Sequence, residues 1–222
     1  TEAKDRYPMW VKRDYSAVED ENIIAKQLAN SKKWDELDEH LKSYKNRDSV
    51  YFWSKTQVLM SKNNYKEAKE IIEGSLTDKS VMKSVSPTEL NDLIEMYLSC
   101  IENTESGERL QKRIEAVIVV LNPKNEIFKN TRERAKFLLI ESYFKEKNKT
   151  LNDINSLVAE FEKFYSNSAY LPRIQYGRAL YYFAQKNTEE GSKILNELIK
   201  NTTTPRHIKE MAKSELSSLT IP

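Results

Sequence analysis

The pattern of hydrophobic and polar positions predicts helices along most of the chain, and it is clearest over residues 49–76. Large or small apolar positions recur every three or four residues on two successive stretches: Phe52, Thr56 and Leu59, then Tyr65, Ala68 and Ile72. A short polar turn, Lys62-Asn63-Asn64, separates the two stretches. Spacings of three and four place side chains on one face of a helix. We therefore predict a helical hairpin here.

The same order of residues occurs earlier in the chain. Four pairs of positions match at a distance of 31 residues: Ala25 with Thr56, Leu28 with Leu59, Trp34 with Tyr65, and Leu41 with Ile72. The polar turn of this earlier copy is Ser31-Lys32-Lys33. Four residue pairs at one constant spacing indicate an internal repeat. The periodic pattern begins at Ala17.

Three further hairpins and a final helix are predicted after residue 76. Pairs of capping residues mark three of the helix starts: Ser86 with Glu89, Asn130 with Glu133, and Thr150 with Asp153. Asn187 caps a helix in the fifth hairpin, and Gly191 stands at its small position. Thr204-Pro205 opens the last helix, whose expected inward side chains are Ile208, Met211, Ala212, Leu216 and Leu219.

The order of large, small and large residues over 49–76 resembles the tetratricopeptide repeat, a helix–turn–helix unit of about 34 residues. The resemblance places Thr56 and Ala68 where the two helices cross closely, with Tyr65 opening the second helix. It implies an all-α fold: an α-solenoid of about five antiparallel hairpins, wound as a right-handed superhelix and closed by a C-terminal capping helix. We expect residues 17–222 to form this repeat domain and residues 1–16 an N-terminal arm or linker.

The composition agrees with a helical solenoid. The chain has 4 Gly and 6 Pro against 32% charged residues, and the 39% hydrophobic share suits a thin structure without a deep centre. Its net charge of +2 is too balanced to indicate nucleic acid or an anionic membrane as the main partner. The longest uncharged apolar run, Ala116 to Leu121, is far shorter than a bilayer span, so no transmembrane segment is expected.

Candidate catalytic and metal-binding chemistry is sparse. The two histidines, His40 and His207, lie far apart in the sequence, and the single cysteine, Cys100, is expected to be a buried, inert thiol. No serine-hydrolase elbow, phosphate-binding loop or zinc-protease motif occurs. We expect no catalytic residue, no metal site and no cofactor, and hence a protein that is not an enzyme.

The resemblance implies a binding groove instead. In the family, the first helix of each hairpin lines a concave groove. The corresponding residues are Asn22, Lys26, Trp53, Gln57, Glu95, Ser99, Phe137, Glu141, Tyr176 and Leu180. Trp53 is the most informative, because Phe52 and Trp53 cannot both face the packing seam of one helix. Tyr182, by contrast, falls at a packing position.

The expected function is that of a non-catalytic protein–protein interaction scaffold, which holds a peptide or a partner protein in the groove. The junction from Phe161 to Asn187 is similar to those of bacterial cell-envelope tetratricopeptide proteins, including the outer-membrane assembly lipoprotein and periplasmic cell-division coordinator families, although Ser166 replaces their proline. This similarity suggests a periplasmic or cell-envelope location, with the cytoplasm as the alternative.

Other readings of the sequence stay open. The chain could be the auxiliary superhelical domain of an envelope enzyme such as a lytic transglycosylase, or, with less support, a nucleic-acid binder. Self-association is also open, because degenerate repeats often bury an exposed face in a dimer. The sequence begins at Thr1 rather than Met, so we expect a processed chain or part of a longer one.

Overall fold

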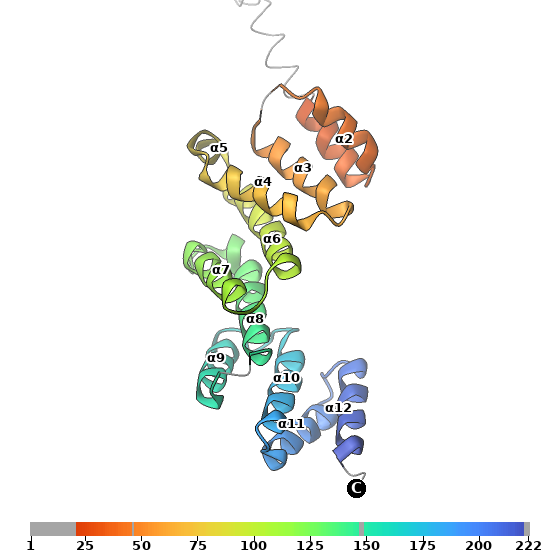
Figure 1. Cartoon of the computed structure of the whole chain (residues 1–222), viewed down its shortest axis with the longest axis vertical. Helices are drawn as coiled ribbons and strands as arrows, with labels where there is room; N and C mark the ends of the chain where they lie inside the picture. The colour runs from red at the N-terminus through yellow and green to blue at the C-terminus, as the bar shows by residue number, and fades with distance from the viewer. Residues whose placement is uncertain (1–20, 46, 147–148, 220–222) are drawn as a thin grey trace, which may run out of the picture. The chain divides into compact units, whose positions relative to one another are not determined.

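The computed structural model describes residues 21–45, 47–146 and 149–219, and its helices are labelled in Figure 1. The predicted arm, residues 1–16, lies outside these described residues. Two compact units divide the chain, Thr1–Thr104 and Glu105–Pro222. Within the described ranges the regular structure is entirely helical, with no β-strand.

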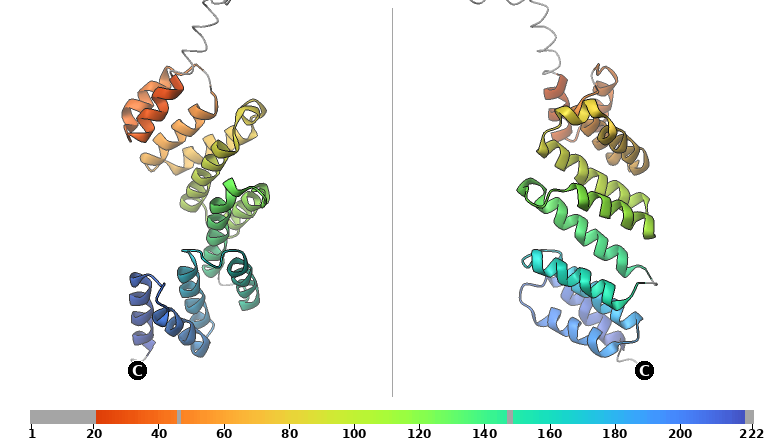
Figure 2. Two further views of the ribbon diagram at one scale, coloured as in Figure 1. Left: turned by 180° about the vertical axis from the view of Figure 1, so that it is seen from behind. Right: turned by 90° about the vertical axis from the view of Figure 1, so that its left-hand side faces the viewer.

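The first unit contains the repeat that the sequence reveals most clearly. Its helices are the segment 21–30, α2 (Trp34–Lys42), α3 (Ser49–Ser61), α4 (Tyr65–Thr77), the short α5 (Lys79–Ser84) and α6 (Pro87–Thr104). Neighbouring helices alternate in direction, as the views in Figure 2 show. The buried core between the first hairpin and α3 consists of Ala25, Ala29, Leu37, Leu41, Val50 and Val58.

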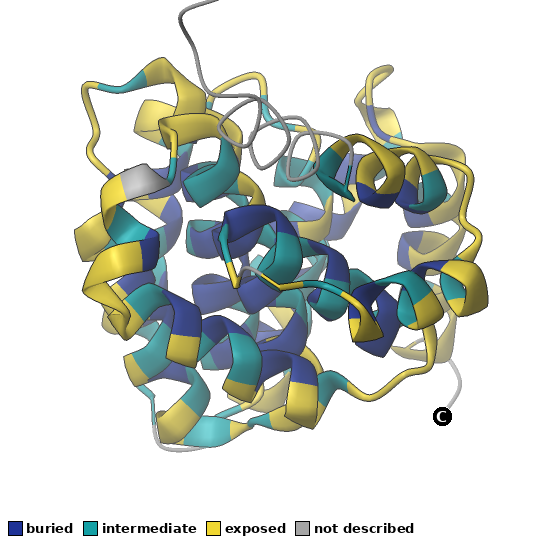
Figure 3. Cartoon of the chain, turned by 90° about the horizontal axis from the view of Figure 1, so that it is seen from above, coloured by how far each residue is buried: buried dark blue, intermediate teal, exposed yellow. Residues whose placement is uncertain are grey.

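The second unit continues the same architecture. Its elements are α7 (Gly107–Val120), a 3-10 turn η1 (Glu126–Phe128), α8 (Lys129–Phe144), α9 (Leu151–Phe164), α10 (Leu171–Ala184), α11 (Thr188–Lys200) and α12 (Arg206–Leu219). The core of its last hairpin consists of Ala179, Tyr182, Ile194, Leu195 and Leu198, with Ile208 and Ala212 from α12. Buried residues lie on the inner helix faces and exposed residues on the outer faces and loops (Figure 3).

The predicted helices are found with few changes. The division between the units falls between α6 and α7, the two helices of the third predicted hairpin. One predicted cap was wrong: α8 begins at Lys129 rather than at Asn130, because η1 leads directly into it and no side chain caps it. Met211 and Leu219 were expected to face inward, yet each is 43% exposed. They lie on the last described helix, where no later helix covers them.

Side-chain caps begin α6, α9 and α11 at the places that the sequence indicates. Ser86 and Glu89 form a reciprocal pair, since the Glu89 N–H donates to Ser86 Oγ at 3.2 Å and the Ser86 N–H donates to Glu89 Oε2 at 3.0 Å. Thr150 and Asp153 repeat this arrangement at α9. These bonds satisfy N–H groups that lack partners within the helix, which fixes where each helix starts.

The tight turns of the first, second and fifth hairpins are built alike. The second residue after each first helix has a positive φ: 55° at Lys32, 58° at Asn63 and 62° at Lys186. In each turn, the next N–H donates to a carbonyl five residues earlier, at 2.9 to 3.0 Å, the acceptors being Leu28, Leu59 and Tyr182. This left-handed C-terminal cap ends one helix and directs the chain straight into the next.

The second and fifth hairpins have a small side chain where their helices cross. Thr56 and Ala68 are fully buried at the crossing of α3 with α4, as predicted. Gly191 has the same role on α11: an added Cβ would lie 2.5 Å from Cε1 of Phe183 on α10. A larger residue at this position would therefore require the Phe183 ring to move.

Polar side chains join successive helices at their edges. Asn155 on α9 accepts a hydrogen bond from Arg178 Nε at 2.9 Å and donates one to the Tyr182 hydroxyl at 3.0 Å. In the first unit, Asp38 on α2 pairs with Lys55 at 2.9 Å and with Lys62 at 2.8 Å. The Lys62 and Lys55 ammonium groups hold the pKa of Asp38 below its usual value.

Replacing Lys186 with glycine is expected to stabilise the protein by about 1 kcal/mol, because a side chain at positive φ is strained and glycine is not. Urea unfolding followed by circular dichroism measures the change. Asn63→Gly is the matched control, with a smaller gain because asparagine tolerates this conformation. A Lys186→Gly variant no more stable than wild type would contradict the proposed strain.

The close crossing predicts opposite effects of one substitution at two helical glycines. Gly74→Ala meets no atom within 4 Å and should stabilise the fold by about 0.5–1 kcal/mol through helix propensity. Gly191→Ala should destabilise it by about 1–2 kcal/mol, since the Phe183 ring would have to move. Thermal unfolding of both variants tests this, and equal shifts would show that Gly191 is not a packing position.

Candidate functional site

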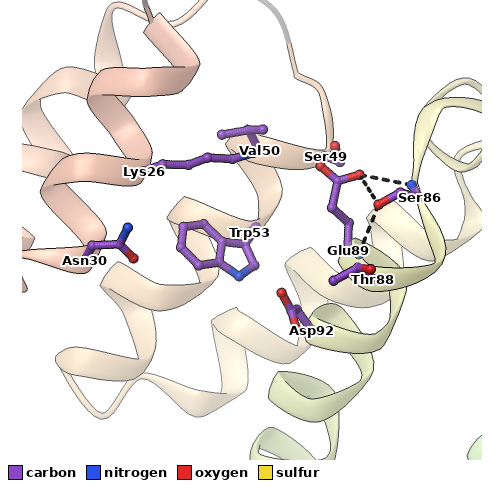
Figure 4. A pocket seen from close by; sticks show the side chains of 9 residues that line it. All are labelled: Lys26, Asn30, Ser49, Val50, Trp53, Ser86, Thr88, Glu89 and Asp92. Carbon is purple, nitrogen blue, oxygen red and sulfur yellow. Dashed lines mark hydrogen bonds between the residues drawn. The ribbon is translucent and has the colours of Figure 1, made fainter. Parts of the chain in front are cut away.

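A pocket of about 400 Å³ lies within the first unit, on the side that the sequence assigns to the groove. Three helices line it: the segment 21–30, α3 and α6, which are the first helices of the first three predicted hairpins. Its lining residues, shown in Figure 4, are Lys26, Asn30, Ser49, Val50, Trp53, Ser86, Thr88, Glu89 and Asp92.

Trp53 forms the aromatic wall of this pocket. One part of its side chain packs against the hydrophobic core of the first hairpin, and the other part faces the cavity. The neighbouring Phe52 packs its ring edge-on against Tyr51 instead, with ring centroids 5.5 Å apart. The two adjacent aromatic residues thus have different surroundings, and Trp53 is the one on the pocket.

Charged groups of opposite sign lie on either side of the Trp53 ring. Lys26 extends from the first helix, while Asp92 projects from α6 near the nitrogen-bearing edge of the indole (Figure 4). Glu89 is occupied by the Ser86 cap. Desolvation raises the pKa of Asp92 above its usual value, and Glu89 and Glu95 add to the rise, although a hydrogen bond from the Asn91 side chain opposes it.

Of the six predicted groove residues in the first unit, two line this pocket, Lys26 and Trp53. Asn22 is engaged elsewhere, because it accepts a hydrogen bond from the Tyr44 hydroxyl and donates one to Asp48 at 3.2 Å. Gln57, Glu95 and Ser99 are half-buried and do not line the cavity. The Ser99 hydroxyl donates to the Glu95 carbonyl at 3.2 Å.

The sequence reasoning missed most of the pocket wall. Asp92 lies one turn before Glu95 on α6, so extending the predicted groove face by one turn would have found it. Asn30 lies at the end of the segment 21–30, and Ser49 and Val50 lie at the start of α3. Their approach depends on how the first hairpin packs against α3, and helical periodicity carries no such information.

In the second unit, other side chains of the protein cover Phe137, the aromatic residue predicted to line the groove. Phe137 is 4% exposed, and it stacks on Tyr170 with ring centroids 4.3 Å apart. The guanidinium of Arg173 lies over the Phe137 ring at 5.2 Å, while its Nε pairs with Glu141 Oε1 at 2.6 Å. Phe137 and Glu141 are therefore partners of Arg173.

The terminal helix has a similar effect on Tyr176. This tyrosine packs against the core cluster that includes Ile208 and Ala212 of α12. Burial raises its pKa, and the nearby carboxylate of Glu215 on α12 adds to the effect. Leu180, one turn further along α10, is half-buried. α12 thus contacts the face of α10 that the sequence assigned to a ligand.

Two other depressions occur in the second unit. One, of about 220 Å³, is mainly apolar and is lined by residues of α7, α8 and α9 that include Ile118, Val119 and Leu157. The other, of about 530 Å³, is lined mostly by uncharged polar and small residues of the loops around α10 and α12. No aromatic side chain lines either one. The Trp53 pocket differs from both by combining an aromatic wall with charges of both signs.

The described parts of the chain were expected to hold no metal site and a buried thiol. No group of three or more His, Cys, Asp or Glu side chains there is placed to hold a metal ion. Cys100 is fully buried, and burial raises the pKa of its thiol to about 11, which makes it unreactive in the folded state. Among these residues, no helix has both the length and the apolar character that a membrane crossing requires.

No family model matches the sequence, and no curated protein sequence matches it either. A solved structure does: YrrB, described as a TPR protein with an unusual peptide-binding site. The two share 17% sequence identity with a TM-score of 0.58, over 87% of this chain and 90% of YrrB. The fold is tetratricopeptide-like. The predicted resemblance and the all-α solenoid class are therefore confirmed, whereas the cell-envelope resemblance stays a prediction.

The raised pKa of Asp92 gives a prediction with a definite sign. A carboxyl group whose pKa is higher in the folded state than in the unfolded state favours folding only while it is protonated. The free energy of unfolding therefore falls as the pH rises from the unfolded-state pKa through the folded-state pKa. Asp92→Asn cannot ionise, so it should unfold at a higher temperature than wild type near pH 7.

Below the pKa of an unfolded aspartate, about 3.9, this difference should vanish because both proteins are then neutral at position 92. Thermal unfolding across this pH range provides the measurement. Glu70→Gln, at an exposed position of α4, controls for the change in net charge. A constant difference at all pH values would mean that ionisation of Asp92 is not its cause.

Proposed function

We propose that this protein is a non-catalytic scaffold that binds a peptide or a segment of a partner protein, with the Trp53 pocket as the centre of the site. The observation that carries the proposal is Trp53 itself. Its side chain is half-buried in the core of the first hairpin, and the remaining surface faces a cavity between three helices.

The physical basis is the preorganisation of the aromatic surface. Packing against the core already fixes Trp53, so little rotamer freedom would be lost when a ligand binds. Tryptophan in a concave setting is among the strongest contributors to protein–protein affinity. A cavity of about 400 Å³ lies in the range of ligand pockets and is small enough to favour individual side chains of a partner.

The wider setting of this function remains part of the proposal. The described peptide-binding site of YrrB supports peptide recognition for this fold, although the two chains share only 17% identity. The junction from Phe161 to Asn187 supports a role in a bacterial cell-envelope assembly, with a periplasmic location. The kind of ligand and the cellular setting bear on which partner binds, and the proposal that Trp53 is the centre of the site does not depend on either.

The test is selection of peptides from a random linear library on the immobilised full chain. Peptides that bind wild type should lose about thirtyfold or more in affinity for Trp53→Leu, since a central tryptophan contributes about 2 kcal/mol or more. Leucine keeps the apolar contact with the core, so circular dichroism should show unchanged helicity. Nuclear magnetic resonance gives a second readout, a shift of the Trp53 indole signal on binding.

Phe164→Leu is the matched control, because Phe164 is 62% exposed on the second unit and lines none of the three depressions. It should bind the selected peptides as wild type does. If every selected peptide binds Trp53→Leu with unchanged affinity, the pocket is not the site and the proposal is wrong.

A further inference from the structure

We propose that the Trp53 pocket receives a basic side chain of the partner, with its charged group between the indole of Trp53 and the carboxylate of Asp92. This inference rests on the proposed function and adds the chemistry of the residue that is recognised. An arginine suits the site best, because its flat guanidinium stacks on aromatic rings and pairs with carboxylates through two hydrogen bonds.

The placement of the pocket's charges decides which end of the ring the cation occupies. Lys26 and Asp92 lie on opposite sides of Trp53, and the carboxylate lies near the indole nitrogen (Figure 4). A cation at the Lys26 side would meet a like charge. At the Asp92 side it would meet the carboxylate of Asp92, and the negative charges of Glu89 and Glu95 on the same helix lie close enough to act on that carboxylate.

Asp92 is distinguished from other carboxylates of the chain by what surrounds it. Asp38 pairs with two lysines, and their ammonium groups lower its pKa. Glu141 pairs with Arg173. Asp92, by contrast, is an exposed residue on the pocket wall that receives a hydrogen bond from Asn91; partial desolvation raises its pKa, and no described basic side chain lowers it. A cation from a partner would supply the missing opposite charge.

The second unit contains an internal template for such a site. Each hairpin has two predicted groove positions, and the first of them are equivalent from one hairpin to another. By this equivalence Trp53 corresponds to Phe137 two hairpins later, and Glu95 corresponds to Tyr176. Counting back three residues from Glu95 and Tyr176 then pairs Asp92 with Arg173. In the second unit, Arg173 covers the Phe137 ring at 5.2 Å.

At the equivalent position, the first unit therefore has a carboxylate instead of a cation, and an open cavity beside the aromatic ring. At Phe137 the chain's own Arg173 supplies the cation over the aromatic ring, whereas at Trp53 a ligand would supply it. The partner's basic side chain would take the place that the Arg173 guanidinium occupies over Phe137.

The experiment uses a peptide selected on the wild-type full chain, synthesised with its conserved basic residue either as arginine or as citrulline, which is an uncharged mimic. We expect the selected peptides to share an arginine or lysine. Replacement by citrulline should weaken binding to wild type about tenfold, and Asp92→Asn should weaken binding of the arginine peptide about tenfold. The two changes remove the same contact, so binding of the citrulline peptide to Asp92→Asn should be only about tenfold weaker than binding of the arginine peptide to wild type.

Two variants serve as comparisons. Glu70→Gln makes the same charge change on the exposed side of α4 and should leave the affinity unchanged. Lys26→Gln removes the like charge on the other side of Trp53 and should tighten binding of the arginine peptide. The citrulline comparison needs no protein variant, so it remains decisive even if Asp92→Asn folds poorly.

A titration of the Asp92 carboxyl by nuclear magnetic resonance gives an independent readout. In the free protein its pKa should lie above the usual range, and the bound arginine peptide should lower it, whereas the citrulline peptide should not. Glu89 and Glu95 on α6, and Lys26 across the pocket, are the charged groups whose titration must be followed alongside.

The outcomes separate this inference from the function on which it rests. Peptides that depend on Trp53 but share no basic residue, or whose two losses simply add, would overturn the basic-residue inference and leave the scaffold function standing. If no selected peptide depends on Trp53, the proposed function fails and this inference fails with it.

Discussion

The second and fifth hairpins depend on the close crossing of their two helices. A small side chain at the crossing lets the backbones approach, and the flanking large side chains then bury themselves against the neighbouring helix. Thr56 with Ala68 and Gly191 with Phe183 are the points where this condition is met most clearly. In these two hairpins the first helix ends in a left-handed cap, which keeps the connection to the second helix short. Within the first unit, Trp53 on α3 faces the pocket that α6 and the segment 21–30 also line.

Most of the fold could be predicted from the sequence, because hairpins are local structures. The two helices of a hairpin are adjacent in the sequence, and the spacing of Leu28 and Leu59 around their turns already encodes the same backbone hydrogen bonds. The helix start at Lys129 could not be read in the same way. A 3-10 turn before it replaces the side-chain cap that marks other starts, so the sequence pointed to Asn130 instead.

The candidate site was predictable only in part, because it combines residues from three hairpins. Lys26 and Trp53 follow from the helix faces alone. Phe137 lies on an equivalent face, but whether it is open depends on Arg173, which lies 36 positions later in the chain. Similarly, Tyr176 belongs to the right face and is nevertheless covered by α12. Helical periodicity tells which side a residue occupies, and the neighbouring hairpin decides what covers it.

Cys100 has a practical consequence for studying the motions of this protein. It is the single cysteine of the chain, and it lies fully buried on α6 in the first unit. A thiol reagent therefore reacts with the native protein only when α6 transiently opens. The labelling rate at low denaturant would report the opening free energy of the first unit alone, and a bound ligand that bridges α3 and α6 should slow it. The natural sequence thus carries a built-in probe for local unfolding next to the pocket.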